Sequence, residues 1–253
     1  MNRPAGALLA LEASQRIGGV ALRAPDGRTH VEQIGEAVPD QERLLPAVDR
    51  AFAALGVAPA SLQAVFVSAG PGGFTGLRVA MATAQGLSLG TGCVTVSVPS
   101  ALVAACTAGL PRDGRVLVAL AAKEEEAWIA GIPAGCSAAN LASAAAPAAD
   151  GTLVTAATLP ALAAGAAVLL ADRHLPRTLA EAAASLRLPL EPLRLNALAC
   201  LEAGAAMLEA GLVTPADLML PIYPRIPEAV RLWRARTGQP AQPAQPAPPA
   251  QTE

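Results

Sequence analysis

Lysine and histidine are nearly absent from this chain of 253 residues. Its 18 basic residues are arginines except for Lys123, and its two histidines are His30 and His174. With a net charge of −2 and a pI of about 5.8, no basic field draws nucleic acid to the chain by itself. Two histidines are too few for a histidine-based metal site. We expect neither histidine to activate the serine of a Gly-x-Ser-x-Gly motif as a nucleophile.

Aromatic residues are also scarce, and the four cysteines form no Cys-x-x-Cys pair. We expect the cysteines to be small buried side chains in a reducing compartment. Mean hydropathy is +0.43, but the most apolar stretch, 159–171, contains Pro160 and Gly165 and is shorter than a membrane span. No signal-peptide pattern follows Met1. The expectation is a soluble, cytoplasmic protein that makes no use of a membrane.

The apolar residues follow strand and helix periods in turn. Predicted strands cover residues 8–11, 18–22, 29–34, 64–68, 93–98, 115–121 and 127–132. Predicted helices cover residues 44–55, 76–89 and 100–108, and a further one begins at Asn196 with Leu198 and Leu201 facing inward. Hairpins followed by alternating strands and helices indicate an α/β fold with mixed sheets in two related lobes.

The same pattern predicts how the chain is divided. Residues 1–110 form an N-terminal lobe, and residues 111–195 form a smaller, alanine-rich second lobe. A helix and an extended segment, 196–225, are expected to pack back on the first lobe. Residues 239–253 are rich in proline, alanine and glutamine, a composition that predicts a disordered tail.

The strongest local signal is a glycine-rich loop between a predicted strand and a predicted helix. Thr75 is expected to cap that helix. Exposed N–H groups ahead of a helix can bind an anion, but the Gly-Lys-Ser/Thr of a P-loop is missing. A structural strand-to-helix turn and a contact with a ligand or partner both stay open. The loop consists of Gly70, Pro71, Gly72, Gly73, Phe74, Thr75 and Gly76.

Glu12 and Ser14 lie in a polar segment between the first two predicted strands. A carboxylate there is able to hold a hydrated Mg²⁺ near a nucleotide phosphate, and the alternative is an exposed hairpin carboxylate. The charge run at 123–126 is better interpreted as a solvated turn than as an acid–base pair. No catalytic residue and no metal site are predicted.

Three segments together resemble the TsaB (YeaZ) family of bacterial tRNA threonylcarbamoyladenosine biosynthesis proteins, grouped with the Gcp/glycoprotease-like proteins. They are residues 9–14, 41–46 and 67–78, and weaker similarity returns at 116–128 and 218–225. The run Gly-Pro-Gly-x-Phe-Thr-Gly-x-Arg, which ends at Arg78, is the most specific part. The resemblance implies an actin/sugar-kinase/Hsp70-type ATPase-like fold.

The resemblance also implies a function and partners. It describes a non-catalytic subunit that binds and activates the transferase TsaD, which modifies N6 of adenosine 37 in tRNA. The implied partners are TsaD in a heterodimer, the ATPase TsaE and a second copy in a homodimer, with tRNA contacted only indirectly. The interface carries over to the helices at 44–55 and 76–89, where Gly76, Ala80, Ala84 and Ser88 form a row of small residues. The expected interface residues are Leu77, Ala80, Met81, Ala84, Leu87 and Ser88.

The implied cofactor is ADP or ATP with Mg²⁺ at the complex interface, and Glu12 and Ser14 are the candidate nucleotide-binding residues. Several polar residues of the family pattern are replaced here, for example by Ala69 and Gly73. The alternative function is a stand-alone ATPase or phosphotransferase of the same fold, in which Glu12 holds the metal. A peptidase is not expected, because the chain has no residues for that chemistry.

Overall fold

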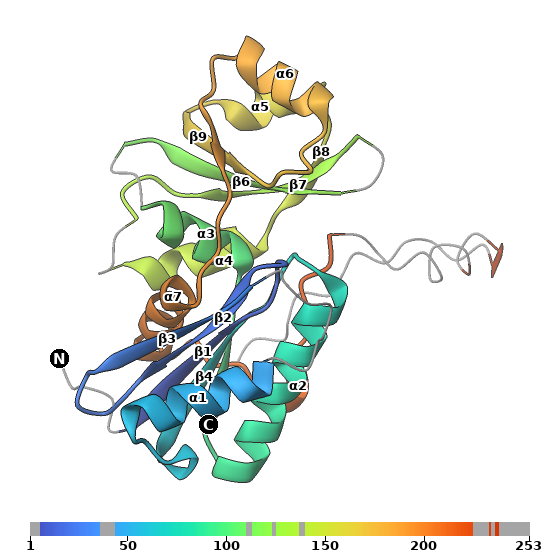
Figure 1. The fold of residues 1–253 in the computed structure, drawn as a ribbon. Helices are drawn as coiled ribbons and strands as arrows, with labels where there is room; N and C mark the ends of the chain where they lie inside the picture. The colour runs from blue at the N-terminus through green and yellow to red at the C-terminus, as the bar shows by residue number, and fades with distance from the viewer. Residues whose placement is uncertain are drawn as a thin grey trace.

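The computed structural model describes residues 6–35, 44–109, 113–122, 125–136, 140–224, 233 and 236–237. The predicted disordered tail at 239–253 lies outside these residues, as does Arg225. The described chain folds into two five-stranded mixed sheets with helices between and around them (Figure 1).

The first sheet contains the first five strands in the order β3-β2-β1-β4-β5. The first three strands form an antiparallel meander, while β4 runs parallel to β1 and β5 parallel to β4. The bounds are β1 (Ala7–Glu12), β2 (Gly18–Arg23), β3 (Thr29–Ile34), β4 (Leu62–Ser68) and β5 (Val94–Val98).

The second sheet repeats this arrangement in the order β10-β9-β6-β7-β8. Strands β6, β7 and β8 form an antiparallel meander, β9 is parallel to β6, and β10 is parallel to β9. The expected α/β fold in two related lobes with mixed sheets is therefore confirmed. The bounds are β6 (Arg115–Ala121), β7 (Ala127–Ile132), β8 (Thr152–Val154), β9 (Ala166–Ala171) and β10 (Leu190–Pro192).

The helices make three layers around the two sheets (Figure 1). Helices α1 (Leu44–Leu55) and α2 (Phe74–Thr91) cover the outer face of the first sheet. Helices α3 (Ser100–Ala108), α4 (Ala145–Ala149) and α7 (Ala197–Glu209) lie between the sheets. Helices α5 (Leu159–Ala163) and α6 (Arg177–Ser185) cover the second sheet from outside. Short 3₁₀ turns are η2 (Pro59–Ser61), η3 (Leu141–Ala144) and η4 (Ala216–Leu218).

The central strand β1 is buried on both faces, and its side chains alternate between two cores. Leu8 and Ala10 face the middle layer, together with residues of the second sheet such as Trp128. Leu9 and Leu11 face α1 and α2. The middle layer is therefore one core that both lobes share.

Helix α7 packs very closely on the first sheet. A Cβ on Gly204 would lie 2.3 Å from the ring of Phe66, so only glycine fits there. The Asn196 side chain accepts the Ala199 N–H at 2.7 Å and caps the helix. Leu198, predicted to face inward, is 41% exposed, so that prediction is wrong. The buried stripe of the helix instead passes through Cys200 and Leu201.

The predicted cap of α2 is also wrong. The helix begins at Phe74, its N-cap is Gly73, and no side chain caps it. Thr75 lies in the first turn because the chain enters the helix earlier than the spacing indicates. Among the described helices, none has both the length and the apolar character required to cross a membrane.

Candidate functional site

Glu12 lies at the end of β1 and is completely buried, so it is neither a loop residue nor an exposed hairpin carboxylate. Its Oε1 accepts hydrogen bonds from the Ser14 backbone N–H at 2.8 Å and from the Ser14 hydroxyl at 2.5 Å. Among the described residues, no group donates to the buried Oε2. Burial raises the pKa of Glu12 above its ordinary value of 4.5, and the Ser14 and Ser68 hydroxyls only partly oppose that rise.

A second buried polar group lies near Glu12, where β4 ends and α3 begins. The hydroxyls of Ser68 and Ser100 are 2.7 Å apart, and the Ser100 hydroxyl also accepts the Gly70 N–H at 3.0 Å. Both serines are buried. These bonds fix the start of the glycine loop to the N-terminal turn of α3, which is a structural role.

The glycine loop packs against the segment that follows β1. The Gly73 N–H donates to the Ser14 carbonyl at 2.7 Å. A Cβ on Gly72 would lie 2.4 Å from that carbonyl oxygen, and one on Gly76 would lie 2.0 Å from the Ala13 oxygen. Gly70, which precedes a cis proline, has a φ of +101°. Close packing and backbone conformation therefore account for Gly70, Gly72 and Gly76, which favours the interpretation of the loop as a structural turn.

Burial disfavours the thiolate form of two cysteines near this region. Burial raises the pKa of Cys200, which lies close to Glu12, well above its ordinary value, and raises that of Cys106 to about 12. All four cysteines are free. Within the described part of the chain, no group of three His, Cys, Asp or Glu side chains is placed to hold a metal ion.

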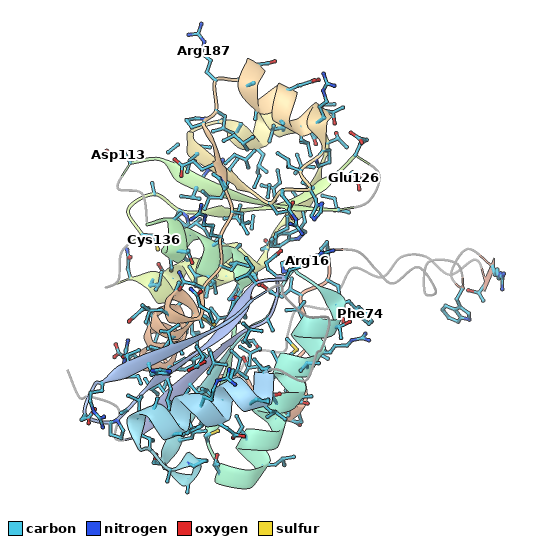
Figure 2. The ribbon with its side chains drawn as sticks, viewed as in Figure 1. Arg16, Phe74, Asp113, Glu126, Cys136 and Arg187 are labelled. Carbon is cyan, nitrogen blue, oxygen red and sulfur yellow. The ribbon has the colours of Figure 1, made fainter. Side chains whose placement is uncertain are left out.

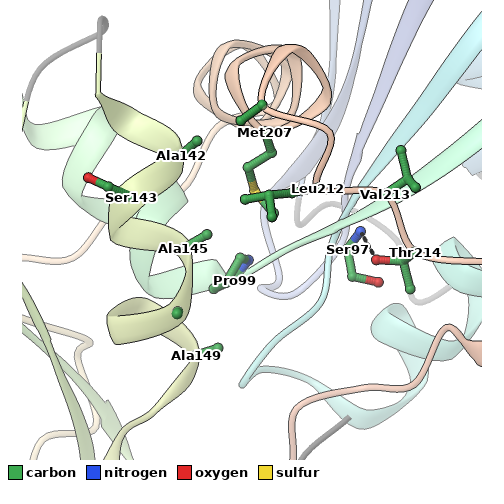
Figure 3. Close-up of a pocket in the computed structure, with 12 residues that line it drawn as sticks. Ser97, Pro99, Ala142, Ser143, Ala145, Ala149, Met207, Leu212, Val213 and Thr214 are labelled. Atoms are coloured by element: carbon green, nitrogen blue, oxygen red, sulfur yellow. Dashed lines mark hydrogen bonds between the residues drawn. The ribbon is translucent and has the colours of Figure 1, made fainter. Parts of the chain in front are cut away.

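A cavity of about 580 Å³ opens between the lobes, away from Glu12 and Ser14. Figure 3 shows Ala145 and Ala149 of α4 on one side, with Met207 and Leu212 across from them. No charged residue lines it, so it offers nothing to balance a phosphate. The full lining is Ser97, Pro99, Ala142, Ser143, Ala145, Ala146, Ala149, Met207, Ala210, Leu212, Val213 and Thr214.

The residues predicted to bind ADP or ATP with Mg²⁺ do not fit that role in this structure. Glu12 and Ser14 have no exposed surface, and their hydrogen bonds join them to each other. A carboxylate that holds a hydrated cation needs an open approach, and raising its pKa by burial disfavours the charged form that binds the cation.

Helix α2 has two different faces, and the predicted partner residues lie mostly on the inner one. Ala80, Met81 and Ala84 are buried in this chain's own core against the first sheet, and Leu77 is buried beside Gly70 of the loop. They are not available to a partner, which corrects the prediction for these four residues. Their apolar spacing matches a buried helix face because the first sheet covers it. The other two, Leu87 and Ser88, are half-buried.

The outer face of α2 presents a second row of small residues that was not predicted from the sequence. Ala82, Gly86 and Gly90 are exposed, and Leu89 beside them is 88% exposed. This row is displaced by two positions from the predicted one, or about 200° around the helix. Its four-residue spacing was visible in the sequence, but only the packing shows which row points outward.

Phe74 and Arg78 of the motif loop are exposed at the start of α2 and contact Tyr223. Tyr223 comes from the extended segment after α7, which returns to the first lobe where the Ile222 N–H donates to the Ala69 carbonyl at 2.8 Å. Tyr223 was not among the site residues predicted from the sequence. A single tyrosine in a chain poor in aromatics was the available signal.

Solved structures define the class of protein to which this architecture corresponds. YeaZ from Pseudomonas aeruginosa matches with a TM-score of 0.66 at 22% identity, covering 86% of this chain and 99% of that one. A second structure, of a protein described as similar to the peptidase YeaZ from Pseudomonas aeruginosa, has the same TM-score and identity and covers 87% and 100%. The fold is therefore the two-lobed α/β fold of these YeaZ structures.

Sequence comparisons point to a particular family. The tRNA threonylcarbamoyladenosine biosynthesis protein TsaB of Haemophilus influenzae is 30% identical over 122 residues, which are 48% of this chain and 51% of that protein. A family model described as TsaD, tRNA N6-adenosine threonylcarbamoyltransferase, matches residues 39–152. The match thus spans about half of the length of the curated relative. The resemblance to TsaB and YeaZ proteins is confirmed.

Proposed function

We propose that this chain is a non-catalytic subunit of the tRNA threonylcarbamoyladenosine machinery, which binds and activates the transferase TsaD. The similarity to TsaB supports a role in tRNA threonylcarbamoyladenosine biosynthesis, and the outer face of α2 supports a role in binding another protein. TsaD in a heterodimer is the main partner in this proposal. The proposal also includes TsaE and a second copy of the chain as partners, with tRNA contacted through TsaD. The proposed location is the cytoplasm.

The observation that carries the proposal is the presence of glycine on an exposed helix face. A Cβ on Gly86 or Gly90 would meet nothing within 4 Å, so the packing of this chain does not require either glycine. Each one destabilises the helix by about 0.5–1 kcal/mol relative to alanine. A row that lacks side chains lets a second helix approach at short interaxial distance. Pairing with another helix gives these glycines a function.

A stand-alone ATPase or phosphotransferase is the less favoured function. Such an enzyme needs a carboxylate that reaches the nucleotide-bound metal, and Glu12, its candidate, is sealed in the middle layer. A turnover assay of the isolated protein with ATP and Mg²⁺ is expected to show no hydrolysis that depends on Glu12. Hydrolysis abolished by Glu12→Gln would overturn the proposal in favour of the enzyme.

Binding to TsaD of the same organism tests the proposal directly. Ala82→Arg places a long charged side chain on the outer row and is expected to prevent capture of TsaD while the fold remains intact. The matched control is Ala184→Arg, an exposed alanine on α6 in the other lobe, which is expected to bind normally. If the wild-type chain and both variants failed to bind TsaD, the proposed function would be wrong. If Ala82→Arg bound as tightly as wild type, the outer row would not be the interface.

Ala84→Arg is not a suitable test of the interface. Ala84 is completely buried against the first sheet, so arginine there would place an unpaired charge in the core. This variant is expected to unfold, and its loss of binding would therefore carry no information about the partner surface.

A further inference from the structure

Three side chains from distant parts of the sequence contact one another at the start of α2. The guanidinium carbon of Arg78 lies 3.5 Å from the centroid of the Phe74 ring. The Arg78 Nε donates a hydrogen bond to the Tyr223 hydroxyl at 3.1 Å, and the Phe74 and Tyr223 ring centroids are 6.2 Å apart. We call these three residues the Arg78 cluster. Their mutual contacts hold the guanidinium in one orientation.

The cluster remains at the surface although two of its members are aromatic. Phe52 and Phe66 are buried, whereas Phe74 is 57% exposed and Tyr223 is 40% exposed. Core packing therefore does not account for the position of Phe74. Aromatic residues and arginine are enriched at protein interfaces, and tyrosine and arginine are among the residues that contribute most to binding energy there.

The charge of Arg78 is not neutralised within the described chain. No described carboxylate lies within ion-pair distance of Arg78, although several other arginines have such partners. Arg16, in the segment that packs on the glycine loop, is exposed and likewise has no described ion pair. Figure 2 shows Arg16 and Phe74 at the same end of the first lobe. Arg16 and Arg78 therefore place two exposed positive charges without a described ion pair at this end of the lobe.

We propose that the Arg78 cluster anchors a carboxylate side chain of the partner transferase, an Asp or Glu that lies beside an apolar residue. The inference rests on the proposed function and names the chemistry of its partner surface. The Arg78 Nε donates its hydrogen bond to the Tyr223 hydroxyl. The two terminal nitrogens of Arg78 therefore remain to bind a carboxylate in the bidentate geometry that arginine favours. The exposed ring of Phe74 packs on the partner's apolar residue beside that carboxylate.

The position of the cluster is consistent with this partner. Arg78 is four residues before Ala82 and eight before Gly86, so it continues the exposed row along α2. A helix that packs on the row would therefore bring a side chain to the cluster. An RNA phosphate is a weaker candidate, because RNA binding depends on several cations along a backbone, and this surface has Arg78 and Arg16 as its described cations.

The experiment measures the dissociation constant for purified TsaD of the same organism by calorimetry, at low and at high salt. Arg78→Glu and Phe74→Ala are each expected to weaken binding about tenfold or more. Arg78→Lys keeps the charge but loses the planar fork, so an intermediate loss is expected. The matched control is Arg187→Glu, the same charge change on an exposed arginine at the far end of the second lobe (Figure 2), which is expected to bind as wild type. Thermal unfolding of each variant confirms that the fold is retained.

Each outcome has a defined meaning. Weaker binding by Arg78→Glu and Phe74→Ala, with Arg187→Glu unchanged, supports the anchor. If wild type binds TsaD and both cluster variants bind equally well, the anchor is wrong while the proposed function stands. If wild type does not bind TsaD, both are wrong. If the variants lose affinity for tRNA but not for TsaD, the anchor is wrong and the cluster is an RNA contact.

Discussion

Glu12 is a carboxyl group whose environment favours the neutral form. Burial raises its pKa, and Cys200 near it stays neutral because burial raises the thiol pKa as well. Below pH 4.5, the ordinary pKa, Glu12 is protonated in both the folded and the unfolded chain. As the pH rises from there towards the folded pKa, only the unfolded chain ionises, so the contribution of Glu12 to stability is progressively lost.

Glu12→Gln removes this loss because glutamine cannot ionise. We expect the free energy of unfolding of the variant to increase relative to that of wild type as the pH rises above 4.5. The increase is at most about 1.4 kcal/mol per pH unit. Urea unfolding at a series of pH values measures the difference in free energy of unfolding between variant and wild type. The contributions of the other carboxylates are the same in both proteins and cancel. The carbonyl of the substituted side chain still accepts the two hydrogen bonds from Ser14. A difference that is flat with pH would show that Glu12 ionises normally in the folded chain.

A substitution at Gly86 of α2 is expected to change stability and partner binding in opposite directions. Because a Cβ there meets nothing within 4 Å, Gly86→Ala is expected to stabilise the folded chain by about 0.5–1 kcal/mol. The same methyl group occupies the exposed row and is expected to weaken TsaD binding. Thermal unfolding and calorimetry on one preparation measure both effects. Weaker binding without a loss of stability would separate the partner surface from the fold.

Gly204→Ala is the matched control in α7, since it is also a glycine to alanine change inside a helix. A Cβ at Gly204 would lie 2.3 Å from the Phe66 ring, so this variant is expected to be destabilised by about 1–3 kcal/mol. If Gly86→Ala were destabilised as Gly204→Ala is, the packing of this chain would require glycine at Gly86, and the exposed row would not need a partner to explain it.

The two rows on α2 also show how far sequence periodicity reaches at the scale of an element. Leu77 and Met81 correctly indicate a buried face, and the small residues Ala80 and Ala84 lie on it. Periodicity reports that a face is covered, but not whether this chain or another covers it. The sequence therefore predicted the helix and its apolar face, while the exposed row, our proposed partner surface, could be identified only from the packing on the first sheet.

At the scale of the whole molecule, the strands were predictable and their order was not. Runs such as 29–34 and 115–121 were identified within a residue or two, because alternation and β-branched residues are local signals. The parallel pairing of β1 with β4 joins segments about 55 residues apart, which no local pattern specifies. The burial of Glu12 follows from the same long-range packing, since α7 covers the end of β1 only in the folded chain.

The shared middle core predicts that the two lobes unfold together. Residues of the first sheet, of α7 and of the second sheet form one apolar cluster, so each lobe would lose the core on its inner face without the other. Trp128 of β7 is buried in this cluster, while Trp233 is 52% exposed. In a Trp233→Phe background, tryptophan fluorescence therefore reports on the second lobe, and far-UV circular dichroism reports on both.

Leu201→Ala tests this coupling, because Leu201 lies on α7 and is completely buried in the shared core. The variant is expected to lower the free energy of unfolding by about 2–5 kcal/mol. Because both lobes depend on this core, the fluorescence and dichroism midpoints in urea should fall by the same amount and remain coincident. A dichroism midpoint that fell while the Trp128 midpoint stayed in place would show that the lobes unfold separately. In that case the middle layer would be a contact between two independent domains.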